Sequence, residues 1–273
     1  MTDWQAFTVE AKDHVAQVTL LGPGKGNAMG PDFWRELPEV FQVLDADPEV
    51  RAVVLTGSGK NFCYGLDLPA MSGTFGPVLA DRALAQPRTT LLHEVRKMQA
   101  AVTAVADCRK PVIAAVSGWC IGGGLDLIAA ADVRYASADA KFSLREAKVA
   151  IVADIGSLHR LPGIIGEGHV RELAYTAKDI DAVRAEKIGL VNDVFLDQEA
   201  VMDAAHATAR EIAANPPLVV QGVKDVLDQR RKDEVAAGLR YVSAWNAAFL
   251  PSEDLTEAIK AVFEKRAPEF KGQ

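Results

Sequence analysis

Long apolar runs and closely spaced cysteines are both missing from this chain of 273 residues. No apolar stretch approaches the length that spans a bilayer. The opening residues, MTDWQAFTVE, have neither the basic part nor the apolar part of a signal peptide. The three cysteines, Cys63, Cys108 and Cys120, lack metal-binding or redox spacing. We therefore expect a cytoplasmic protein with reduced thiols and no membrane partner.

An excess of positive charge is also missing, since the formal net charge is −7. This balance argues against nucleic acid as the main partner. The five histidines show no pairing typical of metal ligands, so we expect no metal site. The C-terminal residues, EFKGQ, differ from a peroxisomal Ser-Lys-Leu signal.

Nucleotide-binding and nucleophile motifs are incomplete. The segment Gly57-Ser-Gly-Lys60 resembles part of a P-loop, but Val54 and Asn61 stand where that motif needs glycine and Ser or Thr. No dinucleotide fingerprint of the G-x-G-x-x-G type occurs with an acidic residue after it. A nucleophile elbow needs a glycine two residues before its serine and another two residues after it, and Ser117 has neither. These gaps exclude the common nucleotide-dependent and serine-hydrolase classes.

Strand-like and helical patterns alternate along the first two thirds of the chain. Strands are predicted over 7–11, 15–20, 52–56, 112–116 and 190–195, and helices over 31–45, 89–106, 168–177 and 181–188. Residues 69–87 are rich in glycine and proline and predict a loop or partly ordered insertion. From residue 198 the pattern is helical, with breaks at 215–217 and Pro251. The sequence thus predicts an α/β core over 1–197 and a helical region over 198–273.

The segment from Pro111 to Pro162 is the most informative. A buried-looking strand is followed by Gly122, Gly123 and Gly124 and then by a helical pattern. Glycines at such a junction let the backbone approach a ligand, and the first helical N–H groups lack intrahelical partners, so the junction suits negative charge.

Three carboxylates, Asp126, Glu146 and Asp154, occur in or shortly after this junction. Taken singly, each has a structural explanation: Asp126 or Glu146 as an acid in the first turn of a helix, and Asp154 as a helix cap. Asp154, however, interrupts an apolar stretch over 149–153, where a carboxylate is costly unless it is partnered or used. Together the acids and the anion-stabilising turn indicate proton-transfer chemistry on a carbonyl compound.

At this point the chain resembles the crotonase (enoyl-CoA hydratase/isomerase) superfamily. The resemblance rests on short motifs in a shared order: Asn27-Ala-Met29, Gly65-Leu-Asp-Leu68, Gly122-Gly-Gly-Leu-Asp126, Arg160-Leu-Pro162, Ala185 to Val191 and Glu264-Lys-Arg266. It implies a spiral of ββα units with a C-terminal helical trimerisation region. It also implies a homotrimer or a dimer of trimers, which would bury apolar residues of the helical region: Val219, Val223, Val226, Leu239, Val242, Trp245 and Phe249.

The resemblance further implies an acyl-CoA thioester substrate and no separate cofactor, since CoA is part of the substrate. The backbone N–H groups of Leu66 and Gly123 would form an oxyanion hole for the thioester oxygen. Lys25, Ala28, Leu66 and Lys265 would contact CoA. For each of the two lysines, a solvated surface position is the competing interpretation.

The carboxylates select the branch of the superfamily. Ordinary hydratases resemble one another in carrying glutamate at the positions of Asp126 and Glu146, and glycine at that of Asp154. The Asp/Glu/Asp set of this chain, and the segments over 33–37 and 153–162, resemble the Δ3,5-Δ2,4-dienoyl-CoA isomerase branch. In that branch Glu146 would be the base at C2, Asp154 the acid at C6, and Asp126 would tune the pair. Ala150 departs from the pattern, because many members have glycine there.

Two alternatives remain at the sequence level. One is an enoyl-CoA hydratase or a Δ3,Δ2-enoyl-CoA isomerase on the same fold, which would need only two of the acids. The other is a catalytically inactive CoA-binding protein, against which the intact acids and glycines weigh.

Overall fold

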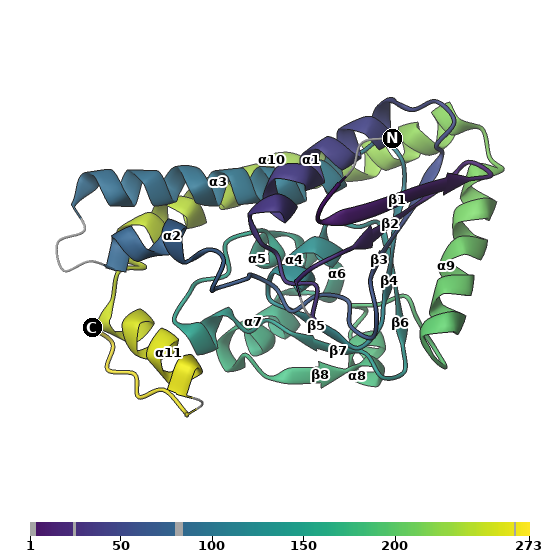
Figure 1. The fold of residues 1–273 in the computed structure, drawn as a ribbon. Coiled ribbons are helices and arrows are strands. Elements are labelled where there is room, and N and C mark those ends of the chain that lie inside the picture. Colours follow the sequence, from purple (N-terminus) through teal and green to yellow (C-terminus); the bar gives the residue numbers. More distant parts are fainter. Residues whose placement is uncertain (1–3, 24–25, 80–83, 265) are drawn as a thin grey trace.

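The computed structural model describes residues 4–23, 26–79, 84–264 and 266–273 (Figure 1). Its central element, within these residues, is a six-stranded sheet in the order β1-β2-β3-β4-β6-β9. The strands are β1 (Phe7–Lys12), β2 (Val15–Leu20), β3 (Ala52–Gly57), β4 (Val112–Val116), β6 (Val133–Ser137) and β9 (Asp193–Phe195). β1 and β2 are antiparallel and the other neighbours are parallel. Every residue of β3 and β4 is buried, as expected for parallel strands covered on both faces.

Helices cover the two faces of this sheet. On one face, α1 (Pro31–Ala46) and α3 (Ala85–Asp107) pack over alternate strand residues such as Val53 and Leu55. On the other face, α9 (Gln198–Ala213) packs over Ala52 and Val54. This division follows from the two-residue period of a strand, which points neighbouring side chains to opposite faces.

A second, three-stranded sheet in the order β5-β7-β8 carries the segments that build the site. It contains β5 (Trp119–Ile121), β7 (Lys141–Ser143) and β8 (Asp179–Asp181). β5 leads directly into α4 (Gly123–Ala129), and β7 leads toward the 3-10 helix η2 (Glu146–Val149). The parallel pairing of β5 with β7 therefore brings the start of α4 close to η2.

The C-terminal region is helical. The 33-residue helix α10 (Pro217–Phe249) runs beside α3, and α11 (Glu253–Glu264) follows a break at Pro251 (Figure 1). The shorter helices are α2 (Ser72–Phe75), η1 (Gly76–Leu79), α5 (Ser157–Arg160), α6 (Pro162–Ile165), α7 (Glu167–Thr176) and α8 (Ala182–Lys187). No helix in the described part of the chain is both long and apolar enough to cross a bilayer.

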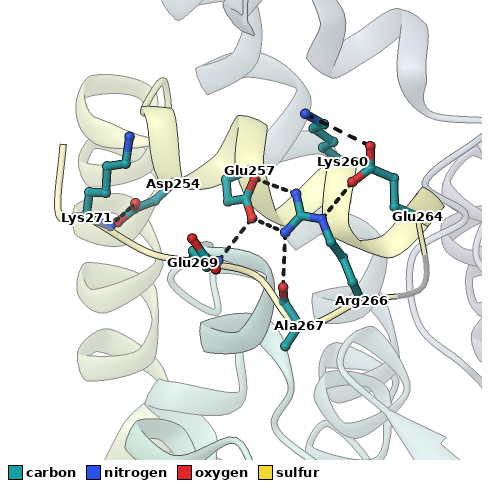
Figure 2. A network of polar contacts seen from close by, with 8 residues as sticks. All are labelled: Asp254, Glu257, Lys260, Glu264, Arg266, Ala267, Glu269 and Lys271. Atoms are coloured by element: carbon teal, nitrogen blue, oxygen red, sulfur yellow. Dashed lines mark hydrogen bonds and ion pairs between the residues drawn. The ribbon is translucent and has the colours of Figure 1, made fainter.

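Last in the chain, residues 266–273 fold back along α11 (Figure 2). The Arg266 guanidinium pairs with Glu257 through both of its terminal nitrogens, and its Nε donates to Glu264 at 2.6 Å. The backbone N–H groups of Lys271 and Gly272 donate to the two carboxylate oxygens of Asp254, at 2.6 and 2.9 Å. The tail is thus fixed to the helix by carboxylates that accept hydrogen bonds.

Most predicted elements are confirmed, with three corrections. The segment over 69–87 contains α2 and η1, and α3 begins at Ala85, so the loop predicted there was wrong in part. Pro87 lies in the first turn of α3, where its missing N–H leaves no intrahelical bond unmade. Strand β9 is only three residues long, and β5 was not predicted because it is equally short.

The boundary at residues 197 and 198 stays a prediction. Directly after it, α9 packs on the sheet, whereas α10 packs on α3. Within α10, Leu239 and Val242 are buried. Val219, Val223, Val226, Trp245 and Phe249 are 42–74% exposed in the single chain.

Candidate active site

All three carboxylates singled out in the sequence line one cavity of about 210 Å³. Asp126 lies in the first turn of α4, Glu146 opens η2, and Asp154 lies in the segment between η2 and α5. The remaining wall is largely apolar and includes Trp34, Leu66, Leu68, Met98, Val149, Ile151, Ile155 and Leu250. A mostly apolar cavity with a few polar groups is typical of a small-molecule site.

Asp126 is the most enclosed of the three acids, with 1% of its surface exposed. Its Oδ1 accepts a hydrogen bond from the backbone N–H of Ser157, the first residue of α5, at 2.5 Å. Burial raises the pKa of Asp126, while the Ser157 N–H and the charge of Arg160 oppose the rise. Asp126 therefore ties α4 to α5 and supplies negative charge beside the other two acids.

Glu146 faces the turn that begins α4. A side chain on Gly122 would place its first carbon 3.2 Å from Glu146 Oε1, and Gly122 has a φ of +52°, so glycine suits this position on both counts. Among the described residues, the buried Oε2 of Glu146 has no hydrogen-bond partner. Burial, and next the charge of Asp126, raise the pKa of Glu146 to about 8.

Asp154 is held from outside the cavity. Its Oδ2 accepts a hydrogen bond from Asn246 Nδ2 of α10 at 2.6 Å. Burial raises its pKa to about 7, and the Asn246 hydrogen bond partly offsets that rise. The interpretation of Asp154 as a helix cap is wrong, because Gly156 caps α5 and the N–H of Ser157 is bonded by Asp126.

Leu66 and Gly123, whose backbone N–H groups are the expected oxyanion-hole donors, lie in segments that border the cavity. Leu66 pairs with Met29 in a parallel bridge whose bonds run through Gly65 O and Asp67 N. Gly123 is the first residue of α4. Within the described chain, neither the Leu66 N–H nor the Gly123 N–H makes a hydrogen bond. Both residues line the cavity together with the three acids.

The close approach of these two segments depends on Gly65. It has a φ of +81°, and a side chain there would lie 2.8 Å from the Ile121 carbonyl oxygen and 3.1 Å from Gly123 N. Only glycine allows the two backbones to come so near one another. Gly65 therefore keeps the segment that carries Leu66 close to the start of α4, as the expected oxyanion hole requires.

Ala150 follows η2 and adopts a left-handed conformation with φ 55° and ψ 34°. This is the position at which the sequence departs from the family's glycine. The left-handed conformation is sterically less favourable for a residue with a Cβ than for glycine. The backbone of the turn that follows Glu146 is therefore strained at Ala150.

Two amide side chains that hold Asp154 were not predicted from the sequence: Asn246 of α10 and Gln99 of α3. Gln99 Nε2 donates to the backbone carbonyl oxygens of Asp154 at 2.7 Å and Leu239 at 3.0 Å. A signal for Asn246 was present, because it continues the buried face that runs through Leu239 and Val242 at helical spacing. A polar residue on such a face needs a partner.

The predicted CoA contacts are only partly described. Leu66 lines the cavity, and Ala28 directly precedes Met29, the bridge partner of Leu66. Lys25 and Lys265 lie outside the described residues. In the described part of the chain, no group of three or more His, Cys, Asp or Glu side chains could hold a metal ion. The three cysteines are buried free thiols, and burial raises the pKa of Cys63 to about 12 and that of Cys108 to about 11.

Comparisons with known proteins identify the family of the chain. A family profile described as enoyl-CoA hydratase/isomerase matches residues 10–273. The chain is 43% identical to a peroxisomal Δ3,5-Δ2,4-dienoyl-CoA isomerase of Arabidopsis thaliana, over 91% of this chain and 89% of the relative. It is 40% identical to a mitochondrial Δ3,5-Δ2,4-dienoyl-CoA isomerase of Dictyostelium discoideum, over 99% of this chain and 93% of the relative.

A solved enoyl-CoA hydratase/isomerase of Pseudoalteromonas atlantica T6c superposes with a TM-score of 0.83 at 26% identity, over 98% of this chain and all of the other. The crotonase-like fold expected from the sequence is thus confirmed. The chain belongs to the enoyl-CoA hydratase/isomerase family.

Proposed function

We propose that this chain is a Δ3,5-Δ2,4-dienoyl-CoA isomerase, which converts a 3,5-dienoyl-CoA thioester into its 2,4 isomer. One observation carries the proposal within the family: a third carboxylate, Asp154, lines the same cavity as Asp126 and Glu146. A shift of two conjugated double bonds removes a proton at C2 and adds one at C6. Two separate proton carriers suit these distant carbons better than one does.

In the first step, Glu146 takes the proton from C2. The C2–H electron pair moves into the conjugated system, and negative charge develops on the thioester oxygen. The N–H groups of Leu66 and Gly123 stabilise that charge; both residues line the cavity, and neither N–H makes a hydrogen bond within the described chain. The positive end of α4 adds to the same effect.

In the second step, Asp154 gives its proton to C6. Its O–H bond breaks, a C6–H bond forms from the electron pair of the dienolate, and the thioester carbonyl is restored. Glu146 then holds a proton and Asp154 holds a negative charge. Asp126 contacts neither proton in this scheme but influences both carriers through its charge.

Burial raises the pKa of Glu146 to about 8 and that of Asp154 to about 7. Both groups can therefore take up and release a proton near neutral pH, and they titrate as an interacting pair. After each turnover a proton must pass from Glu146 back to Asp154.

The two alternatives from the sequence are less well supported. A hydratase or a Δ3,Δ2-enoyl-CoA isomerase would leave Asp154 without a chemical role, although it faces the cavity with a raised pKa. A non-catalytic CoA-binding protein would have no need to bury Asp126 and Glu146 together, which raises the pKa of both.

The remaining expectations about partners are part of this proposal. The substrate is an acyl-CoA thioester and no separate cofactor takes part, with Lys25 and Lys265 as candidate CoA contacts. A homotrimer or a dimer of trimers is supported by the exposed apolar residues of α10, since patches of this kind usually mark interfaces. The proposed location is the cytoplasm, although the two relatives compared above are peroxisomal and mitochondrial.

An activity panel tests the proposal. Turnover of 3,5-dienoyl-CoA, 2-enoyl-CoA and 3-enoyl-CoA thioesters is measured side by side by absorbance. We expect the 3,5-dienoyl thioester to give the highest kcat/KM. A preference for hydrating 2-enoyl-CoA, with no dienoyl turnover, would replace the proposal by the hydratase alternative.

A further inference from the structure

The contact between Asn246 and Asp154 joins the longest helix of the protein to the cavity. Asn246 is 1% exposed, and its Nδ2 donates both to Asp154 Oδ2 at 2.6 Å and to the Val152 carbonyl oxygen at 2.9 Å. Asp154 lines the cavity, whereas Asn246 is absent from the described residues that do so. Asn246 therefore touches the acid and not the space in which the substrate would react.

We propose that Asn246 is a positioning residue that selects Oδ1 of Asp154 as the oxygen that carries the transferable proton. The proposal rests on the function proposed above, in which Asp154 protonates C6. It adds a role for a residue of α10 that neither the sequence motifs nor the relatives' names assign.

The selection follows from hydrogen-bond chemistry. Both of the hydrogens on Nδ2 have acceptors, Asp154 Oδ2 and the Val152 carbonyl, so the amide cannot turn over without losing two bonds. In a neutral carboxyl group the carbonyl oxygen is the stronger acceptor, so a bond from an N–H donor to Oδ2 favours the form in which Oδ2 is the carbonyl oxygen. The hydroxyl of protonated Asp154 is consequently Oδ1.

The same bond assists proton delivery. When the Oδ1–H bond breaks and C6 gains the proton, Asp154 becomes negative while still accepting from Asn246. Hydrogen bonds to charged groups are stronger than bonds between neutral groups, so the contact strengthens as the proton leaves. Asn246 thereby stabilises the product of the transfer more than the reactant.

The surroundings keep this arrangement in place. Lys224 of α10 pairs with Asp132 at 2.8 Å, and Gln99 of α3 bonds the backbone of both Asp154 and Leu239, so α10 is fixed to the core. The titratable groups near Asp154 are Asp126 of α4 and Glu146 of η2. Arg145, just before η2, lines the same cavity. The side chains of α3 and α10 that bond Asp154 are the neutral amides of Gln99 and Asn246.

The test compares Asn246→Leu and Asn246→Asp with the parent protein. We expect isomerase kcat to fall about 10- to 100-fold in each, as for other misplaced catalytic groups. Exchange of the C2 proton in heavy water, which needs only Glu146 and the oxyanion hole, should survive. Loss of the donor should also move the alkaline limb of the kcat/KM profile upward by about one pH unit, because the ionised acid loses a stabilising bond.

Two controls separate positioning from folding. Gln99→Met removes a buried amide that bonds only backbone oxygens, so the melting temperature should fall while the alkaline limb stays in place. Adding Asn246→Leu to Asp154→Asn should cause no further loss of isomerisation, since Asn246 acts through Asp154. Should Asn246→Leu fail to fold, Asn246→Asp keeps the shape of the side chain; its carboxylate cannot donate to Asp154 and repels the ionised acid, so the alkaline limb should move upward at least as far.

Each outcome bears on one of the two proposals. Parental kcat and an unmoved limb in a folded Asn246 variant, or additive losses in the double variant, would overturn the positioning role. Full isomerase activity in Asp154→Asn would instead overturn the proposed function. The combination of an inactive Asp154→Asn and a fully active Asn246→Leu rejects the positioning role alone.

Discussion

Carboxylates gather in two places in this protein, and the two clusters have opposite properties. Asp126, Glu146 and Asp154 line the cavity, and burial raises the pKa of all three. At the C-terminus Asp254, Glu257 and Glu264 bond Arg266 and the backbone of the tail (Figure 2). There the hydrogen bonds from Arg266 lower the pKa of Glu257 to about 2.

The difference lies in the partners. Glu257 accepts from a guanidinium and from the Glu269 N–H, both of which favour its charged form. Glu146 has no such donor on Oε2 among the described residues and lies beside another acid. A carboxylate with strong donors fixes a piece of chain, whereas one kept near neutrality can take up and release a proton.

Asp154→Asn tests the interior cluster most severely. The amide keeps the size of the side chain but cannot deliver a proton to C6. Loss of one general acid costs about 10²–10⁴-fold in rate, so dienoyl isomerisation should fall by that factor. C2 deuterium exchange and the melting temperature, measured on the same sample, should change little. Unchanged isomerisation in the folded variant would show that Asp154 is structural.

The pH dependence of kcat/KM provides a second test. The active form needs ionised Glu146 and protonated Asp154, so the profile should be bell-shaped with limbs near the pKa values of about 7 and about 8. The limbs belong to the interacting pair and not to either residue alone. C2 exchange in Asp154→Asn should show only the rising limb, because it needs only ionised Glu146. A flat profile from pH 6 to 9 would exclude both groups.

The two clusters should respond to pH in opposite directions. The pKa of Glu146 is raised from 4.5 to about 8, so its stabilisation of the fold is complete below pH 4.5 and is lost as pH rises through 8. The melting temperature of the parent protein should therefore fall over this range. Glu146→Gln should flatten the fall and exceed the parent in melting temperature above pH 8. If the melting temperature of Glu146→Gln falls with pH as steeply as that of the parent, Glu146 is not the group responsible.

The smallest effect is expected at the C-terminal cluster. The pKa of Glu257 is lowered from 4.5 to about 2, so its contribution is present above pH 4.5 and is lost as pH falls through 2. Glu257→Gln should lower the melting temperature slightly at pH 7 and leave isomerase turnover unchanged, because exposed ion pairs contribute little. Glu269→Gln, whose backbone N–H still reaches Glu257, is the matched control. A large loss of turnover would show that the tail affects the cavity.

Local patterns in the sequence predict much of this architecture. The continuous apolar runs of β3 and β4, the triple glycine and the order of the three acids each depend on neighbours in the chain. With the family resemblance, they also predict Leu66 and Gly123 as oxyanion-hole donors. The short strand β5 and the helix α2 escaped prediction because three or four residues show no clear period.

The support of Asp154 could not be predicted in the same way. Asn246 lies 92 residues from Asp154 along the chain, and the contact exists only because α10 packs beside α3. The raised pKa values are likewise a product of burial in the assembled cavity. A single sequence shows which side chains are polar, but it does not show which of them come into contact in the folded protein.

The proposed oxyanion donors are main-chain groups, and this has a consequence for how such proteins diversify. No side-chain replacement deletes the Leu66 or Gly123 N–H, short of proline, and a side chain at Gly65 would instead push apart the segments that present them. Enolate stabilisation is thus inherited with the path of the chain, while the proton carriers are exchangeable side chains. Point mutations at 126, 146 and 154 can then alter the reaction while the capacity to bind a thioester enolate is retained. Hydratases and isomerases within one family are the expected result of that division.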